Sequence, residues 1–213
     1  MREKRKASKG TAKTTRVVAA KTSGKANAGF RTVFSPAQIG KRVKELSRQI
    51  ARDFGEGDIH AIGILDSGFA FFSDLVRNFA CPVICHFVKM EPVDTVMGTH
   101  EIRTISYGRI GDIEGKNVLV VAALIDSGIT VDYLVQQLLL QNPKAVRTVA
   151  LIDRVDHRRV PFEVEYPGFS WEGGLLVGYG LDKDGRYRNL PYVATVTPPT
   201  TGTRRQQKGR RSN

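Results

Sequence analysis

The feature that most restricts the fold is an uninterrupted apolar run of eight residues, Val118–Ile125. A run without polar alternation is typical of a central parallel strand whose two faces are both covered by helices. Strand and helix patterns alternate on either side of it, which predicts an α/β fold with a doubly wound, mostly parallel sheet. Eight residues are too few to cross a bilayer, so we expect no membrane partner.

The sharpest helix start is Ser35–Gln38, which combines a good N-cap residue, a proline at the first helical position and a glutamine that completes a capping box. An apolar stripe at spacings of three and four continues this helix to Phe54, where glycines follow. Two further helices are expected over Phe69–Ala80 and Thr130–Leu140. The other expected strands are Ile59–Leu65, Pro82–Val88, Glu101–Ser106, Val146–Ile152, Leu175–Tyr179 and Tyr192–Val196.

Charge is distributed unevenly along the 213 residues, which have a formal net charge of +12. Residues 1–34 contain ten Lys or Arg and one acid, and residues 200–213 contain five Lys or Arg and no acid. The segment between them is close to neutral, and a hydrophobic content of 41% supports one core. We therefore predict a disordered basic tail over 1–34, a folded domain over 35–197 and a second disordered basic tail over 198–213.

Tails of this composition bind polyanions such as DNA or RNA by counterion release, without sequence specificity. Two alternatives remain open, a merely solubilising extension and, for the N-terminal tail, a transit peptide. The basic start lacks the apolar stretch of a secretory signal, and two cysteines cannot form a disulfide framework. These features favour a cytoplasmic location, with association with the nucleoid, or a mitochondrial location, as alternatives.

Open parallel sheets bind ligands beyond the carboxyl ends of their strands, which here means after Leu65, Ile125 and Ile152. The apolar run leads directly into Asp126–Thr130. In this segment Gly128 lets the backbone approach a ligand, while hydroxyls and the first helical amides suit an anion. The segment is therefore either a phosphate cradle or an ordinary strand-to-helix turn in which Asp126 caps the helix.

Five stretches resemble the type I phosphoribosyltransferases, in particular their hypoxanthine/guanine branch. They are Ile113–Val121, Asp126–Thr130, Ala150–Arg154, Val177–Asp182 and Arg186–Pro191. The likeness covers about residues 35–197, so the fold that it implies is the doubly wound sheet of that family. The assembly that it implies is a homodimer or a homotetramer.

The resemblance implies a transfer of ribose 5-phosphate from phosphoribosyl diphosphate to hypoxanthine or guanine, with Mg²⁺ as cofactor and release of pyrophosphate. The implied catalytic acid or base is Asp126. The other implied roles are 5′-phosphate binding by Ser127, Gly128, Ile129 and Thr130, base binding by Arg154, Leu175 and Val177, pyrophosphate binding by Asp66, Ser67 and Arg188, and metal binding by Asp182.

Several positions depart from the family pattern. Two adjacent acids that hold the ribose hydroxyls are replaced by Ala122 and Ala123, and a Lys-Gly pair at the pyrophosphate is replaced by Asp66 and Ser67. Each lost charged hydrogen bond costs about 1.5–3 kcal/mol. The Ser-Tyr pair of the lid falls at 92–93. Arg154 and Leu175 stand where the family has a lysine and an aromatic residue.

We therefore expect a catalytically impaired or non-catalytic domain that binds a phosphate, a nucleotide or phosphoribosyl diphosphate, with tails that bind polyanions. The alternative is an active enzyme of purine salvage that uses Mg²⁺. A basic cluster after the strand that ends at Ile152 either holds nucleotide phosphates or is a solvated face. It consists of Arg154, His157, Arg158 and Arg159.

The remaining histidines and cysteines of the early strands do not form a metal motif. Cys81 and Cys85 share one face of a strand, whereas His86 points to the other face. A zinc site needs more ligands than these residues offer. His60 lies inside an apolar strand, which is typical of a core histidine whose polar atoms find partners.

Overall fold

The computed structural model describes residues 29–92, 103–107 and 110–196 of the chain. The segments 1–28 and 197–213, which contain most of the predicted tails, lie outside these ranges, as does most of the predicted lid. The helices are α1 (Pro36–Phe54), α2 (Phe69–Val76) and α3 (Ile129–Leu139), with a short 3₁₀ helix η1 (Val155–His157). The strands are β1 (Phe30–Phe34), β2 (Ile59–Leu65), β3 (Val83–Pro92), β4 (Arg103–Tyr107), β5 (Asn117–Ile125), β6 (Ala145–Asp153), β7 (Tyr166–Ser170), β8 (Leu176–Val177) and β9 (Val193–Val196).

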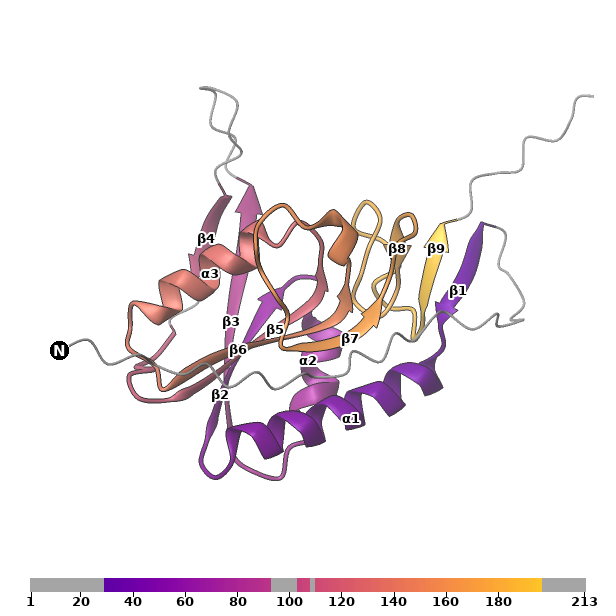
Figure 1. The fold of residues 1–213 in the computed structure, drawn as a ribbon. Helices are drawn as coiled ribbons and strands as arrows, with labels where there is room; N and C mark the ends of the chain where they lie inside the picture. The colour runs from indigo at the N-terminus through magenta and orange to yellow at the C-terminus, as the bar shows by residue number, and fades with distance from the viewer. Residues whose placement is uncertain (1–28, 93–102, 108–109, 197–213) are drawn as a thin grey trace, which may run out of the picture.

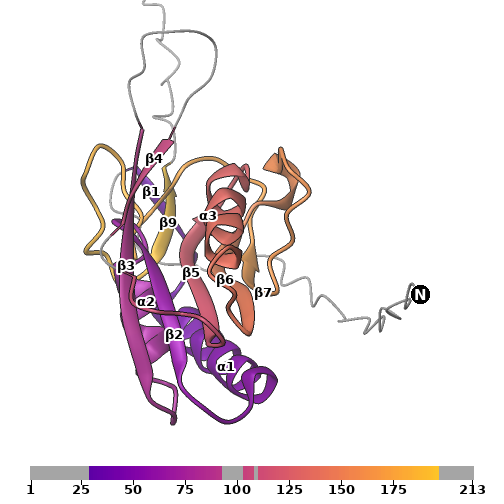
Figure 2. The same cartoon turned by 90° about the vertical axis from the view of Figure 1, so that its left-hand side faces the viewer.

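A six-stranded sheet in the order β4-β3-β2-β5-β6-β7 forms the centre of the molecule, and only the β3–β4 pair in it is antiparallel. Helices α1 and α2 cover one face and α3 covers the other (Figures 1 and 2). Alternate residues of β5 pack on opposite sides, with Val121 against α1 and α2 and Val120 against α3. The predicted doubly wound, mostly parallel sheet is confirmed, with the apolar run at its centre.

A second, antiparallel sheet in the order β1-β9-β8 lies beside the main sheet (Figure 1). Phe30 of β1 is paired with Val196 of β9, and Phe34 is buried with its ring stacked 4.2 Å from the ring of Phe169. The predicted boundary of the N-terminal tail at residue 34 is therefore wrong, because β1 is part of the fold. The basic composition of residues 1–34 concealed this short apolar stretch.

Most expected elements form where the sequence placed them. The capping box of α1 is present, since the Ser35 hydroxyl accepts from the Gln38 amide at 3.3 Å and the Gln38 side chain accepts from the Ser35 amide at 2.9 Å. Helix α2 ends at Val76 instead of Ala80, because the Asn78 side chain donates to the Asp74 carbonyl at 2.7 Å and competes with helical hydrogen bonding. The sequence did not predict β1 or β7.

None of the helices in the described ranges has the length and apolar character that a membrane crossing requires.

Candidate active site

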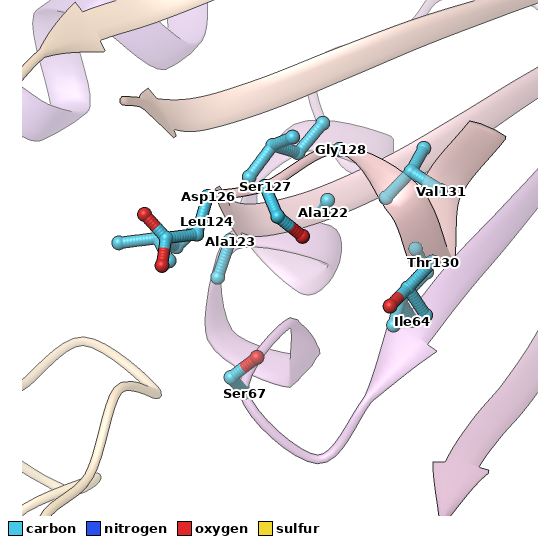
Figure 3. Close-up of a pocket in the computed structure, with 11 residues that line it drawn as sticks. Ile64, Ser67, Ala122, Ala123, Leu124, Asp126, Ser127, Gly128, Thr130 and Val131 are labelled. Atoms are coloured by element: carbon cyan, nitrogen blue, oxygen red, sulfur yellow. The ribbon is translucent and has the colours of Figure 1, made fainter. Parts of the chain in front are cut away.

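A cavity of about 220 Å³ lies at the carboxyl edge of the main sheet, where β2 and β5 end (Figure 3). It is lined by Ile64, Ser67, Ala122, Ala123, Leu124, Ile125, Asp126, Ser127, Gly128, Thr130 and Val131. In the close-up, the hydroxyls of Ser67, Ser127 and Thr130 face a common space, whereas the Asp126 carboxylate extends away from Thr130. The cavity thus has one wall of hydroxyls and one wall of small apolar side chains.

The turn between β5 and α3 has the geometry of an anion cradle. Gly128 adopts a φ of 81° and serves as the N-cap residue of α3, and its carbonyl accepts from the Asp132 amide at 2.9 Å. The cap of α3 is therefore Gly128, not Asp126, which removes the capping role that the sequence left open for that acid. The hydroxyls of Ser127 and Thr130 face the cavity, and the free amides at the start of a helix such as α3 suit an anion.

Arg158 clamps this turn from the segment that follows β6. Its guanidinium donates to the Asp126 carbonyl at 2.9 Å and forms an ion pair with Asp153, whose side chain is only 8% exposed. The Arg159 amide donates to the Ser127 carbonyl at 2.9 Å. Burial raises the pKa of Asp153, and the charge of Arg158 opposes that shift. Sequence reasoning missed Asp153, although its position directly after a buried strand was a usable signal.

The Asp126 carboxylate is held by two cationic or polar partners. His157 Nδ1 lies 3.2 Å and Arg154 Nε 3.6 Å from its Oδ1 atom. Arg154 also lies 2.8 Å from His157 Nε2 and donates to the Gly173 carbonyl at 2.8 Å. Because a guanidinium cannot accept a hydrogen bond, His157 Nε2 accepts and His157 Nδ1 carries the proton that faces Asp126. The basic cluster of the sequence is thus organised around Asp126.

Next to Asp66, which precedes the cavity-lining Ser67 in the chain, Arg188 lies between two carboxylates. It lies 2.9 Å from Asp182 Oδ1 and 4.0 Å from Asp66 Oδ2, and it donates to the Gly180 carbonyl at 2.7 Å. The second Asp182 oxygen accepts from the Gly185 amide at 2.8 Å. The three charged side chains, named here the Arg188 triad, carry a net charge of −1. The structure therefore brings together Asp66, Arg188 and Asp182, which the sequence assigned to pyrophosphate and metal.

The residues assigned to the base lie outside the cavity lining. Val177 is fully buried in β8, so its side chain faces the core, whereas Leu175 is half exposed and its carbonyl accepts from Thr195 Oγ1 at 3.1 Å. Arg154 is directed at Asp126 and Gly173. Of these three residues, only Arg154 is shown to contact a residue of the cavity lining, through its ion pair with Asp126.

The described residues do not build a magnesium site on their own. Within the described ranges, no group of three or more His, Cys, Asp or Glu side chains is arranged to hold a metal ion. Both oxygens of Asp182 already have partners, Arg188 and the Gly185 amide. Magnesium in proteins commonly takes one or two carboxylates together with phosphate oxygens of the substrate. A Mg²⁺ ion would therefore have to arrive with a diphosphate-bearing ligand.

Comparison with known proteins gives the family. The model of the phosphoribosyl transferase domain matches residues 33–184. This chain belongs to the type I phosphoribosyltransferases, in the hypoxanthine/guanine branch. A hypoxanthine-guanine phosphoribosyltransferase of Bacillus subtilis is 30% identical over 175 residues, which cover 79% of this chain and 93% of the relative. One from Aquifex aeolicus is 36% identical over 159 residues, which cover 74% of this chain and 89% of the relative.

Solved structures of related enzymes support the same family and fold. A crystal structure of a hypoxanthine-guanine phosphoribosyltransferase from Bacillus anthracis, with a HEPES molecule in its active site, superimposes with a TM-score of 0.74 at 35% identity. The superposition covers 78% of this chain and 98% of the Bacillus anthracis chain. A hypoxanthine phosphoribosyltransferase from Trypanosoma cruzi superimposes with a TM-score of 0.76 at 27% identity, covering 83% and 95%. The family and the central sheet predicted from the sequence are confirmed.

Proposed function

We propose that this phosphoribosyltransferase domain binds the 5′-phosphate of a nucleotide at Ser127–Thr130 and is impaired in phosphoribosyl transfer. The observation that carries the proposal is the Arg188 triad, in which Asp66 and Asp182 compensate the charge of Arg188. Transfer requires stabilisation of the departing pyrophosphate. A triad with a net charge of −1 repels such a polyanion, whereas the cradle on the other side suits a single phosphate.

The cavity walls add a second obstacle to transfer. Ala122 and Ala123 line the cavity and provide neither a charge nor a hydrogen-bonding side chain. Orientation of the two reactants supplies much of the rate in group transfer, and two alanines cannot orient a sugar through hydrogen bonds. In this proposal Arg154, Leu175 and the backbone near Val177 contact the base, and Asp126 lies between base and phosphate.

The test is calorimetry on the full-length chain. GMP is expected to bind without Mg²⁺, whereas phosphoribosyl diphosphate with Mg²⁺ is expected to bind about tenfold more weakly or not at all. The variant Asp66→Lys should restore affinity for phosphoribosyl diphosphate, since it changes the triad charge from −1 to +1. Tight binding of phosphoribosyl diphosphate by the unmodified chain, or an equal affinity in D66K, would contradict the proposal.

The second candidate is an active purine-salvage enzyme, and the observation in its favour is the ion-paired Asp126–His157–Arg154 group next to the phosphate cradle. In that reaction the bond between ribose C1′ and the pyrophosphate oxygen breaks, a bond from C1′ to a purine nitrogen forms, and Asp126 takes part in the proton transfer. Pyrophosphate release from hypoxanthine or guanine with Mg²⁺ would support it. That release must fall at least tenfold in Asp126→Asn, or it does not come from this site.

The basic segments at the two ends of the chain support a further proposal about partners, the binding of DNA or RNA. Such binding should weaken steeply between 50 and 200 mM salt, because each released counterion adds to the slope. Replacing Arg204, Arg205, Lys208, Arg210 and Arg211 by glutamine should reduce that slope. A homodimer or homotetramer is proposed from the family resemblance, and light scattering on the full-length chain tests it.

A further inference from the structure

The stretch of β5 that forms the cavity wall next to the phosphate cradle has no polar side chain, although the Ser67 hydroxyl faces the same space from the segment after β2. Ala122, Ala123 and Leu124 form this wall, with Ile64 and Val131 at its margins. The hydroxyls of Ser127 and Thr130 lie on the phosphate side (Figure 3). Because one cavity contains both walls, a phosphate in the cradle places the first carbons of its ester over the alanines.

The nearest carboxylate does not compensate for this apolar wall. Asp126 lines the same cavity, but its Oδ1 atom contacts His157 and Arg154, and the side chain extends away from Thr130. A sugar hydroxyl placed against the alanines therefore loses water on that side and gains no acceptor from the alanine side chains. Such a group carries a desolvation penalty that a hydrogen atom in its place does not.

We infer that the site is specific for phosphomonoesters of a hydroxyl-poor sugar, and that a 2′-deoxynucleoside 5′-monophosphate is a better ligand than its ribonucleotide. The inference rests on the proposed binding of a 5′-phosphate at Ser127–Thr130 and names the ligand class of that same site. In this inference the base contacts residues on the far side of Asp126. The preference against sugar hydroxyls comes from Ala122 and Ala123.

The experiment is a calorimetric comparison of GMP, dGMP and 2′,3′-dideoxy-GMP on the full-length chain, with inorganic phosphate as the probe of the cradle. The expected order of affinity is dideoxy-GMP, then dGMP, then GMP, with about three- to tenfold between successive ligands, since 1.4 kcal/mol corresponds to tenfold. Binding of GMP tenfold or more tightly than dGMP would overturn the inference while leaving the proposed phosphate site intact. Failure of every ligand to bind would overturn both.

Variants at the wall sharpen the comparison. Ala122→Ser and Ala123→Ser each add one hydroxyl to the cavity, so they should move the GMP to dGMP affinity ratio toward GMP by about threefold or more. The matched control is Ala150→Ser, which makes the same change on β6, at the position paired with Ala122 but outside the cavity lining. It should leave the ratio unchanged. Equal ratios in the wall variants and the control would contradict the role of the wall.

A 5′-phosphate on a 2′-deoxyribose occurs both in free mononucleotides and at the 5′ ends of DNA strands. A 5′-phosphorylated oligodeoxynucleotide and its 5′-hydroxyl counterpart separate the two sources, because any contribution of the basic segments is common to both. Tighter binding of the phosphorylated strand identifies strand ends as a source of the ligand. Equal binding of both strands, together with dGMP binding, identifies the free mononucleotide.

Discussion

At the Ser127–Thr130 side of the cavity, cationic side chains hold the turn from outside and leave its amides and hydroxyls directed inward. At the Arg188 side, the cation itself is directed toward Asp66 and Asp182 and is compensated by them. Both sides belong to the same edge of one fold. The difference teaches that two turns at one sheet edge can arrange charge in opposite ways, one with cations bound to the outside of the turn and one with its cation compensated by carboxylates.

The largest effect is expected from breaking the clamp on the phosphate side. Arg158→Met leaves the Asp153 carboxylate buried without its ion-pair partner, which should cost about 3 kcal/mol of unfolding free energy. Chemical denaturation measures this loss. The matched control Arg159→Met changes an exposed neighbour that contributes through its backbone amide, so its cost should stay within about 0.5 kcal/mol. Equal costs in both variants would show that the clamp does not stabilise the turn.

A smaller but local effect is expected from Gly128→Ala. The φ of 81° disfavours a side chain, and the new Cβ would lie 2.8 Å from Arg158 Cδ and 3.2 Å from Val160 Cγ2. We expect a loss of about 1–3 kcal/mol in stability and at least tenfold in affinity for inorganic phosphate or dGMP.

The control for this change is Gly115→Ala, which has a φ of 65° but an open surrounding. It should share the backbone strain and keep the phosphate affinity. Calorimetry separates the two variants, and equal affinities in both would refute the view that the turn holds the phosphate.

Next in size is the removal of one carboxylate from the other side. Asp66→Asn makes the Arg188 triad neutral, so affinity for pyrophosphate should rise about three- to tenfold while affinity for GMP changes little. Titration with pyrophosphate in the presence of Mg²⁺ measures the change. Asp184→Asn changes an exposed acid between β8 and β9, in the segment that contains Asp182 and Arg188, and this control should have no such effect. A similar gain in both would mean that only the overall charge matters.

The smallest effect concerns a region remote from both sides. His60 Nδ1 and His86 Nε2 lie 3.3 Å apart on neighbouring strands, and burial lowers the pKa of each ring. Lys116 lowers the pKa of His60 further, while Asp58 and Asp112 raise it, and the charge of His60 lowers the pKa of His86.

Because the unfolded chain binds more protons below about pH 6.5, the stability that these neutral rings contribute is present above that pH. It is lost as the pH falls through their lowered pKa values. Thermal unfolding between pH 7.5 and 5 should show the decline, and His60→Gln with His86→Gln should flatten it. A pH profile that is identical in the double variant would contradict this origin.

The sequence predicted those parts of the molecule that depend on local signals. The capping box at Ser35, the apolar run of β5 and the glycine turn before α3 each specify structure within a few residues, and each formed as expected. The short strand β1 was missed because its partner β9 lies far away in the sequence, and β7 was missed because its sequence contains Pro167 and Gly168, which are rare inside strands.

The same reason explains what sequence reasoning missed around the site. It named Arg188, Asp66 and Asp182 separately, but their mutual compensation depends on loops that are distant in the chain. The contact of His60 with His86 depends equally on the pairing of two strands, whereas the ion pair of Arg158 with Asp153 depends on how the chain turns back just after β6. Local patterns identify which residues gather at a sheet edge, whereas the pairing of their charges requires the tertiary structure.

The pairing of β1 with β9 has a consequence for the two basic segments. Phe30 and Val196 are antiparallel neighbours, so the chain enters and leaves the domain at one corner (Figure 1). Both charged segments are thus attached at almost the same point. Residues 1–34 and 200–213 together contain 15 of the 33 Lys and Arg residues but only one of the 21 acids. If these segments bind a polyanion as proposed, contact with one segment would raise the effective concentration of the other at the polyanion surface, and the two would bind as a bivalent pair.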